Sequence, residues 1–495
     1  MDGEIISRES CKKVVKEYLD IEDFEICDVK IEQFFDEVNG FLGEHLLLLI
    51  DIRIRDENKV LRFFTKRFPF GHVMQSDFLI SMNGWQREIY FYEIFLKNLH
   101  KTIPGFCIDF VPKYLLGIPN DIIVFEDLTL KNYDLPRQTS LNLLNNKHIC
   151  LVLEALAKLH ASSLAYEEYK SREHGEHFRL FSGDEDFIKE PLIRKEEGFL
   201  GHDFYNAAIK GLRALISKVY KNNLIPLEEV HQKFDILAEH ALELMTPQNI
   251  FRNVLAHGDL WAKNVMFQYE GESDEPQHVL LVDFQLPRYH IPAHDVLLFI
   301  SLTTNKEMRK RYFHFFLKHY HNALSEQLNY VGIKTDDIGL SYDEFLKSVS
   351  YIIPEVKIQG PLQRLQQCGN KNFYKNLLND KEAFKMFIFG DKTPFALELF
   401  ETDDNFRILL TEAIEEIIEV ALHPQIFRED CYRILEQELG HSEYEIIEYR
   451  VSKISKCDFL FQLEVSLLNK NERQDLKYLA ECKPLGYTRL VERLI

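Results

Sequence analysis

The sequence predicts an α+β fold with a strand-rich first part, a mainly helical second part and a small strand-containing C-terminal appendage. Three observations lead to this prediction. Between residues 24 and 66 apolar and polar residues alternate, as in half-buried strands, whereas much of the chain from residue 147 to 422 shows helical spacing. A polar stretch rich in turn formers, residues 130–146, separates the two patterns. We therefore expect domains at residues 1–128, 129–423 and 424–495.

Composition narrows the classes of function. The net charge is −20, from 59 basic and 79 acidic residues, and such a field repels nucleic acid and anionic membranes. The longest uninterrupted apolar runs, such as Leu46–Ile50, are strand-sized, so no membrane-spanning segment is expected. Eight cysteines without a CxxC pair, and charges where a signal peptide needs an apolar core, favour a cytoplasmic protein with free thiols. Oligomeric state is not readable from these features.

Five strands are expected in the first part, and they are Phe24–Glu32, Glu44–Ile54, Val60–Lys66, Val111–Ile118 and Asp121–Phe125. The turn between the first two contains Gly40 and Gly43. Such a turn can bring backbone N–H groups close to phosphates, or it can be a plain hairpin turn.

Lys66 ends the third strand, where a lysine is either solvated or paired with a carboxylate. Glu88 is the candidate partner, because the helical spacing of Trp85, Ile89 and Tyr92 places it on the next helix. A strand lysine held by a helix glutamate can bind the α- and β-phosphates of ATP.

The fifth strand runs into Glu126, Asp127 and Leu128 and then into the polar stretch. An apolar strand that opens into a linker is where backbone groups could bind adenine.

Helical spacing predicts a helix from Lys147 onward and further helices at Gly201–Val230, Gln232–Met245, Lys306–Gln327, Tyr342–Tyr351 and Asp404–Leu422. His160 lies on or beside the first apolar stripe and is interpreted as a hydrogen-bonded core histidine. Asp295, just before an apolar helix, is assigned a structural role. The acidic segment GDEDF, at 183–187, is expected to be a solvated loop.

The chemistry centres on HGDLWAKNVMF and the later VDF. His257, Asp259 and Asn264 follow the spacing H-x-D-x-x-x-x-N, and a hairpin formed by Val265–Tyr269 and Val279–Val282 would return Asp283 beside Asn264. Phosphoryl transfer needs these residue types in this order. The Asp259 carboxylate would accept the proton of the attacking hydroxyl, with His257 in the same catalytic loop. The amide oxygen of Asn264 and the carboxylate of Asp283 would hold Mg²⁺.

HGDLWAKNVMF, VDFQLPRYHIPAHDVL, FEDL, LAKLHA and REIYFYEIF together resemble the ecdysteroid-kinase-like proteins of insects, within the choline-kinase-like and aminoglycoside-phosphotransferase-like small-molecule kinases. The resemblance covers about residues 10–423. It implies a two-lobed protein-kinase-like fold, with an antiparallel-sheet N-lobe and a helical C-lobe, and ATP- and Mg²⁺-dependent phosphorylation of a small-molecule hydroxyl. Two positions depart from the family pattern: the glycine turn is irregular, and Lys263 stands where a small or amide residue is usual.

The leading hypothesis is therefore an ATP:alcohol phosphotransferase that acts on an ecdysteroid or a similar steroid or xenobiotic metabolite. A choline or ethanolamine kinase is the second reading, and it needs an anionic, aromatic-lined pocket. A pseudokinase that binds a ligand without chemistry is the third.

The appendage contains an internal repeat. Cys431–Tyr449 aligns without gaps on Cys11–Val29, and matching Pro484 to Pro69 puts Glu481 where Lys66 stands. The interpretation is that residues 424–495 are the start of a degenerate second N-lobe, without the phosphate-binding lysine.

Overall fold

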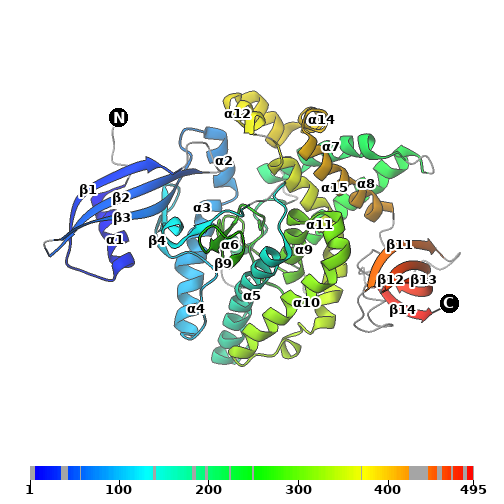
Figure 1. The fold of residues 1–495 in the computed structure, drawn as a ribbon, viewed down its shortest axis with the longest axis horizontal. Coiled ribbons are helices and arrows are strands. Elements are labelled where there is room, and N and C mark those ends of the chain that lie inside the picture. The colour runs from blue at the N-terminus through cyan, green and yellow to red at the C-terminus, as the bar shows by residue number, and fades with distance from the viewer. Residues whose placement is uncertain are drawn as a thin grey trace. The chain divides into compact units, whose positions relative to one another are not determined.

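The structure is a computed structural model that describes most of the chain (Figure 1). Its residues fall into two compact units, each built from separate parts of the sequence. Unit 1 comprises Met1–Gln138, Ser162–Leu192 and His257–Arg288, and unit 2 comprises Thr139–Ala161, Ile193–Ala256 and Tyr289–Ile495. The described residues are 6–34, 43–55, 57–137, 141–180, 185–194, 199–221, 225–247, 250–369, 371–422, 444–453, 460–469, 472–482 and 488–493.

The α+β class predicted from the sequence is confirmed, with an antiparallel sheet near the N-terminus, many helices and strands in the C-terminal appendage. The boundaries at residues 128 and 423 stay predictions. Gly40, Cys431 and Pro484, which were singled out in the sequence, lie outside the described residues.

Unit 1 contains a five-stranded antiparallel sheet in the order β1-β2-β3-β5-β4. Helix α1 (Arg8–Leu19) shares an apolar core with this sheet. The strands lie close to the five predicted ones and are β1 (Glu25–Gln33), β2 (Glu44–Ile54), β3 (Glu57–Arg67), β4 (Tyr114–Ile118) and β5 (Ile122–Glu126).

The pleat of this sheet decides where Lys66 points. Leu48 and Phe63, which are paired across β2 and β3, belong to the core shared with α1. Successive side chains of a strand point to opposite faces, so His45 and Lys66, another cross-strand pair, lie on the face away from α1. The alternation of apolar residues therefore aims the lysine away from the α1 core.

The helix predicted around Glu88 is present and contains a π-helical turn. Three segments, α3 (Gly84–Ile89), η1 (Tyr90–Leu96) and α4 (Lys97–Thr102), follow one another without a break. Trp85, Glu88 and Phe91 are buried. π-Helical turns inside helices are frequently found at functional sites, and here the turn begins two residues after Glu88.

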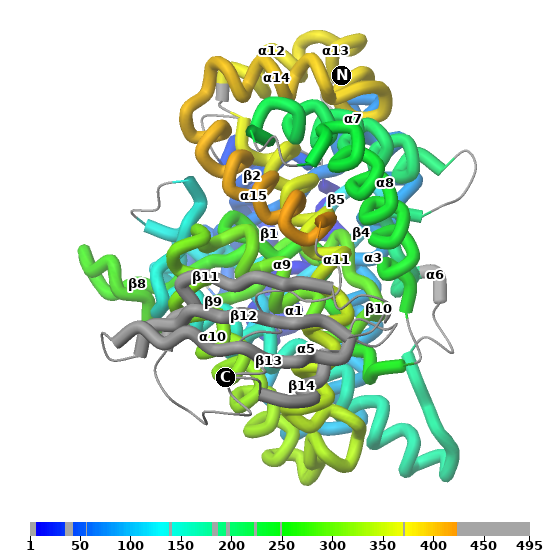
Figure 2. The backbone as a smooth tube through the Cα atoms, turned by 90° about the vertical axis from the view of Figure 1, so that its right-hand side faces the viewer, coloured from blue at the N-terminus to red at the C-terminus, as the bar shows by residue number. Residues whose placement is uncertain are grey.

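Unit 2 contains the C-terminal strands but is otherwise mainly helical, and α11 (Tyr342–Gln367) packs against most of its long helices (Figure 2). The prediction that this helix ends at Tyr351 was wrong, since it continues through Pro354 and Pro361. A proline inside a helix costs about 3 kcal/mol. Nearly every residue from Ile352 to Leu365 is buried, so packing outweighs that cost. Its neighbours are α7 (Leu200–Val219), α8 (Leu227–Leu244), α9 (Pro292–Thr303) and α15 (Asp404–Leu422).

The predicted helix Gly201–Val230 is in fact two elements, because α7 ends at Val219 and α8 begins at Leu227, directly after Pro226. The helix that was expected from Lys147 is α5 (Asn146–His174), and it contributes residues to both units. By length and composition α5 could cross a membrane, but 78% of its most apolar window is buried within the protein, as in a core helix.

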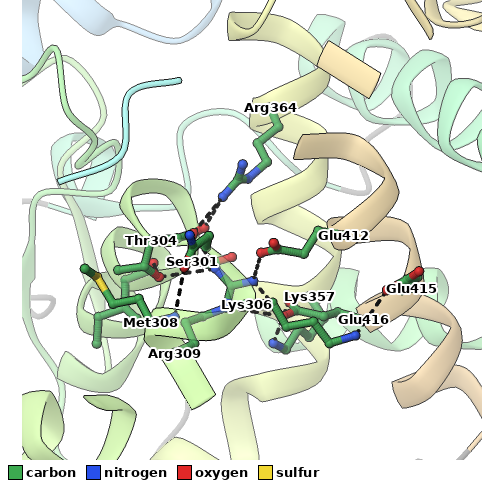
Figure 3. A network of polar contacts seen from close by, with 12 residues as sticks. Ser301, Thr304, Lys306, Met308, Arg309, Lys357, Arg364, Glu412, Glu415 and Glu416 are labelled. Carbon is green, nitrogen blue, oxygen red and sulfur yellow. Dashed lines mark hydrogen bonds and ion pairs between the residues drawn. The ribbon is translucent and has the colours of Figure 1, made fainter. Parts of the chain in front are cut away.

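A buried ionic network joins four helices of unit 2 (Figure 3). Arg309 of α10 (Lys306–Tyr330) donates to Glu416 of α15 at 2.6 Å and also pairs with Glu412. Lys357 of α11 donates to the other oxygen of Glu416 at 3.0 Å. Burial alone would raise the pKa of Glu416, but the two cations outweigh it and hold that pKa far below its usual range. Arg364 extends the network to the Ser301 carbonyl of α9.

The C-terminal strands form an antiparallel sheet in the order β11-β12-β13-β14. Its pairing repeats that of the first sheet. The cross-strand pair His45–Lys66 corresponds to Leu460–Glu481 when 415 is added to each number (481 − 66 = 415). The register shift between Ile26 and Asp28 recurs between Ile446 and Glu448 (446 − 26 = 420). The strands are β11 (Tyr444–Lys453), β12 (Leu460–Asn469), β13 (Glu472–Cys482) and β14 (Thr488–Arg493).

A chain that ends at Leu422 tests the independence of this second sheet. Because the ionic network of α15 is retained, we expect the shortened protein to unfold cooperatively and to keep whatever stabilisation Mg-ATP gives the full chain. Melting curves with and without Mg-ATP measure both properties. If the shortened protein were insoluble, or if ATP stabilised only the full chain, the second sheet would instead be an integral part of the main core.

Candidate active site

Three segments far apart in the sequence meet at Lys66. Its Nζ lies 2.8 Å from Glu88 Oε2, on α3, and 2.7 Å from Asp283 Oδ1. Lys66 is 4% and Glu88 1% exposed, and the Asp283 side chain is 35% exposed. Lys66 is therefore paired rather than solvated, and the carboxylate that remains accessible to a ligand is that of Asp283.

Burial and pairing oppose each other at this ion triplet. Burial would lower the pKa of Lys66, but the Asp283 and Glu88 carboxylates outweigh it and raise the pKa. The pKa of Glu88 is raised because burial is only partly offset by Lys66. The pKa of Asp283 is lowered, since the attraction of Lys66 exceeds the effect of burial. Lys66 and Asp283 are accordingly charged at neutral pH.

The catalytic loop predicted at residues 257–264 lies beside this triplet, between β7 (Val254–Ala256) and β8 (Val265–Tyr269). Asn264 Nδ2 donates to the backbone carbonyl of Asp259 at 2.7 Å and to its Oδ2 at 3.1 Å. This leaves the amide oxygen of Asn264 as its acceptor for a ligand.

The predicted hairpin is present. β8 pairs with β9 (Pro276–Leu281), and the Val282 N–H donates to the Asn264 carbonyl at 3.0 Å. His257 links the two ends of the hairpin. Its Nε2 lies 3.0 Å from the Val282 carbonyl, and the Asp259 N–H donates to its Nδ1 at 3.4 Å. With Nε2 toward a carbonyl and Nδ1 toward an N–H, the His257 ring ties the loop to the end of β9 and positions it.

The environment of Asp259 suits a group that gains and loses a proton. Burial and the neighbouring Asp283 carboxylate raise its pKa to about 7, against the opposing effects of Arg288, Asn264 and Lys66. A general base is most effective when its pKa lies near the working pH.

The predicted adenine-facing residues lie at the end of β5. The Glu126 carboxylate accepts from the Lys113 N–H at 2.9 Å and pairs with Lys131. The Asp127 carboxylate caps the following turn at Thr129 and pairs with Arg62 at 3.0 Å. Both acidic side chains are engaged within the protein, so any contact with adenine would come from the backbone or from Leu128.

Gly43 adjoins Lys66. A Cβ at Gly43 would lie 3.4 Å from Lys66 Cγ, which is ordinary van der Waals contact. The chain at Gly43 therefore passes close to the stem of the lysine, but this contact alone does not require a glycine.

Sequence reasoning missed His45, Arg87, Glu190 and Arg288. His45 lies on the same sheet face as Lys66, and burial together with the Lys66 charge lowers the pKa of His45 to about 4, so it is neutral at pH 7.

The prediction of a solvated loop at residues 183–187 was wrong at its C-terminal end, because Glu185–Ile188 forms α6 and Ile188 is fully buried. The prediction followed the three acidic residues of GDEDF and gave too little weight to the apolar pair Phe187 and Ile188.

The interpretation of His160 as a core histidine is confirmed. It is fully buried, its Nδ1 lies 2.6 Å from the Tyr320 hydroxyl, and its Nε2 lies 3.3 Å from Asp295. Asp295 thus supports the helix packing of unit 2.

The donor set fits magnesium and a nucleotide. Asp283 and Asn264 offer one carboxylate and one amide oxygen, and magnesium typically takes few protein oxygens while phosphates and water complete its shell. Among the described residues no group of three or more His, Cys, Asp and Glu forms an all-protein metal cage. Lys66 would supply a cation for a bound phosphate.

The sequence matches the ecdysteroid kinase-like family over residues 42–333, more than half of the chain. The comparison with curated proteins gave no match. Among solved structures, the chain is similar to a choline kinase from Cryptosporidium parvum Iowa II, with 16% identity, a TM-score of 0.35, and coverage of 80% of this chain and 91% of that one. A likeness at that level adds nothing to the family match.

Lys66→Met should lower phosphotransferase activity, and Glu88→Gln should lower it less, because the first removes the phosphate cation and the second only its anchor. Since the two side chains are in contact, the double variant should be little worse than Lys66→Met alone. Turnover rates of the three variants measure the coupling. Lys218→Met, at an exposed ion pair of unit 2, serves as the control and should be silent. Strictly additive losses would contradict the pairing.

Asp283→Ala should abolish the magnesium dependence of ATP binding, because it removes the metal carboxylate. The measurement is the shift in melting temperature caused by ATP, with magnesium and with EDTA. If Mg-ATP stabilised the variant as strongly as the parent, Asp283 would be only a partner of Lys66 and not a metal ligand.

Proposed function

The chain belongs to the ecdysteroid kinase-like family of small-molecule kinases, and on that premise we propose that it transfers a phosphoryl group from ATP to a hydroxyl of an ecdysteroid or a similar steroid or xenobiotic metabolite. The observation that carries this proposal is the meeting of Lys66, Glu88 and Asp283 beside the Asp259–Asn264 loop. We place the reaction in the cytosol.

Lys66 has the position and charge to bind the α- and β-phosphates. Glu88 holds the ammonium group on the sheet face away from α1. Burying that charge there without a carboxylate would be unfavourable. A ligand phosphate at this point would compete with Asp283 for the lysine, and the accessible Asp283 carboxylate could then turn to a metal ion.

Asp259 is the proposed general base. Its carboxylate is held by Asn264 Nδ2 at 3.1 Å, and its backbone is held through His257. It would accept the proton of the substrate hydroxyl as the hydroxyl oxygen attacks the γ-phosphorus, the bond from that phosphorus to the β–γ bridging oxygen breaks, and ADP leaves. Magnesium, when bound by Asp283 and the oxygen of Asn264, would neutralise charge on the phosphates.

The test is magnesium-dependent ATP consumption against a panel of ecdysteroids, other sterols, plant glycosides, choline and ethanolamine, with the phosphorylated product identified by mass spectrometry. We expect turnover of a sterol or glycoside hydroxyl. Turnover of choline or ethanolamine instead would support the second reading, and ATP binding without turnover of any alcohol would support a pseudokinase.

The value of kcat/KM should rise with pH through about 7. Asp259 carries a proton below its raised pKa and is active as a base only above it. Initial rates between pH 5.5 and 8.5 measure this profile. Asp259→Asn should reduce turnover by about a hundredfold or more and remove the rise, while ATP still stabilises the protein. A flat profile in the parent, or near-normal turnover in the variant, would contradict the assignment.

A further inference from the structure

The short segment Phe187–Leu192 of unit 1 is buried although it follows an acidic stretch. Ile188 is fully buried, Glu190 is 4% exposed and Leu192 is 7% exposed. The Phe187 ring stacks on Tyr90, with centroids 5.1 Å apart, and Tyr90 lies two residues after Glu88. Figure 1 shows α6, which ends at Ile188, close to α3, and the two elements are in contact. The segment therefore packs against the helix that carries Glu88.

Arg87 fastens the segment to that helix. Its side chain is 2% exposed, and its Nη1 donates to the carbonyls of Phe187 at 2.8 Å and Lys189 at 2.9 Å. The same nitrogen lies 3.2 Å from the carbonyl of Pro287, which follows the metal-loop residue Asp283 by four positions. One guanidinium thus joins the Glu88 helix, the segment and the continuation of the metal loop.

Glu190 makes the second connection. One oxygen accepts from the Leu192 N–H at 2.8 Å, and the other pairs with Arg288 Nη1 at 2.5 Å. Arg288, which is 1% exposed, donates from Nη2 to the Gly258 carbonyl at 3.1 Å. Gly258 is the residue directly before Asp259. The Glu190–Arg288 ion pair is therefore connected to the catalytic loop through the hydrogen bond from Arg288 to Gly258.

The loop packs on this arginine without spare room. Gly258 has φ of +79°, and a Cβ there would lie 2.1 Å from the Leu286 carbonyl oxygen and 2.8 Å from Arg288 Nε. Only glycine fits such a backbone at such a distance. The Arg288 charge also opposes the rise in the pKa of Asp259.

We propose that the Phe187–Leu192 segment positions both halves of the phosphotransfer site, fixing Glu88 through Arg87 and the Asp259 loop through the Glu190–Arg288 pair. Arg87, Glu190 and Arg288 are positioning residues in this proposal, because each acts through its neighbour. The proposal rests on the proposed function for its catalytic consequence, but the fixing of the loop can be measured separately.

The two tryptophans of the chain provide that measurement. Trp85 lies on α3 two residues before Arg87, and Trp261 lies in the catalytic loop two residues after Asp259. In a Trp85→Phe background, the fluorescence of Trp261 reports on the loop alone. Glu190→Gln should raise the quenching of Trp261 by acrylamide about twofold, because Arg288 loses its carboxylate while the volume of the side chain is kept.

Turnover gives the catalytic arm, using the alcohol identified by the panel. We expect Glu190→Gln to lower kcat about tenfold per folded molecule, with the dissociation constant of Mg-AMPPNP changed less than twofold. The matched control is Glu416→Gln, which also breaks a buried pair with an arginine but lies in unit 2. It should lower the melting temperature and leave both the quenching and kcat unchanged.

If Glu190→Gln does not fold, Arg288→Lys serves in its place. It keeps a cation beside Glu190 but loses the fork that reaches the Gly258 carbonyl, so the quenching of Trp261 should still rise. Unchanged quenching together with unchanged kcat in the folded variant would overturn the proposal. Raised quenching in a protein that phosphorylates no alcohol would uphold the positioning and refute the proposed function alone.

Discussion

The arrangement depends on one buried lysine. A charged ammonium can leave water only where carboxylates replace the lost hydration, and Lys66 finds two of them, Glu88 and Asp283. Each comes from a different segment, so the sheet, the helix after it and the β8–β9 hairpin must all be in place before the charge is satisfied. The same requirement that stabilises the fold assembles the groups that phosphate and metal would meet.

The residues that a ligand could reach at the site are not the residues that hold the site in place. Lys66 and Glu88 are almost inaccessible, whereas Asp283 and Asp259 are partly open. A ligand therefore meets carboxylates whose positions are set by groups behind them. His257 is the clearest example of such a supporting group. One of its ring nitrogens contacts the Val282 carbonyl and the other accepts from the Asp259 N–H, so both are engaged within the protein.

The sequence predicted the residues whose chemistry is local and missed those whose role is tertiary. The spacing H-x-D-x-x-x-x-N, the helical position of Glu88 and the hairpin before Asp283 follow from short-range patterns. Arg87 and Arg288 lie inside the quoted stretches REIYFYEIF and VDFQLPRYHIPAHDVL, but the role of these two residues and of Glu190 depends on partners about a hundred residues away, which no local pattern shows. The continuation of α11 through Pro354 was missed for the same reason, because burial overrides the local cost of proline.

The second sheet has a consequence for how the chain folds. The β2–β3 and β12–β13 pairs share the same register, so β13 would offer β2 a partner whose ladder geometry matches that of β3. Tandem copies of one topology are prone to exchange strands during folding. Divergence of the side chains, such as Glu481 at the place of Lys66, is then a form of kinetic protection: a mispaired β2–β13 ladder would lack the lysine that the buried Glu88 requires.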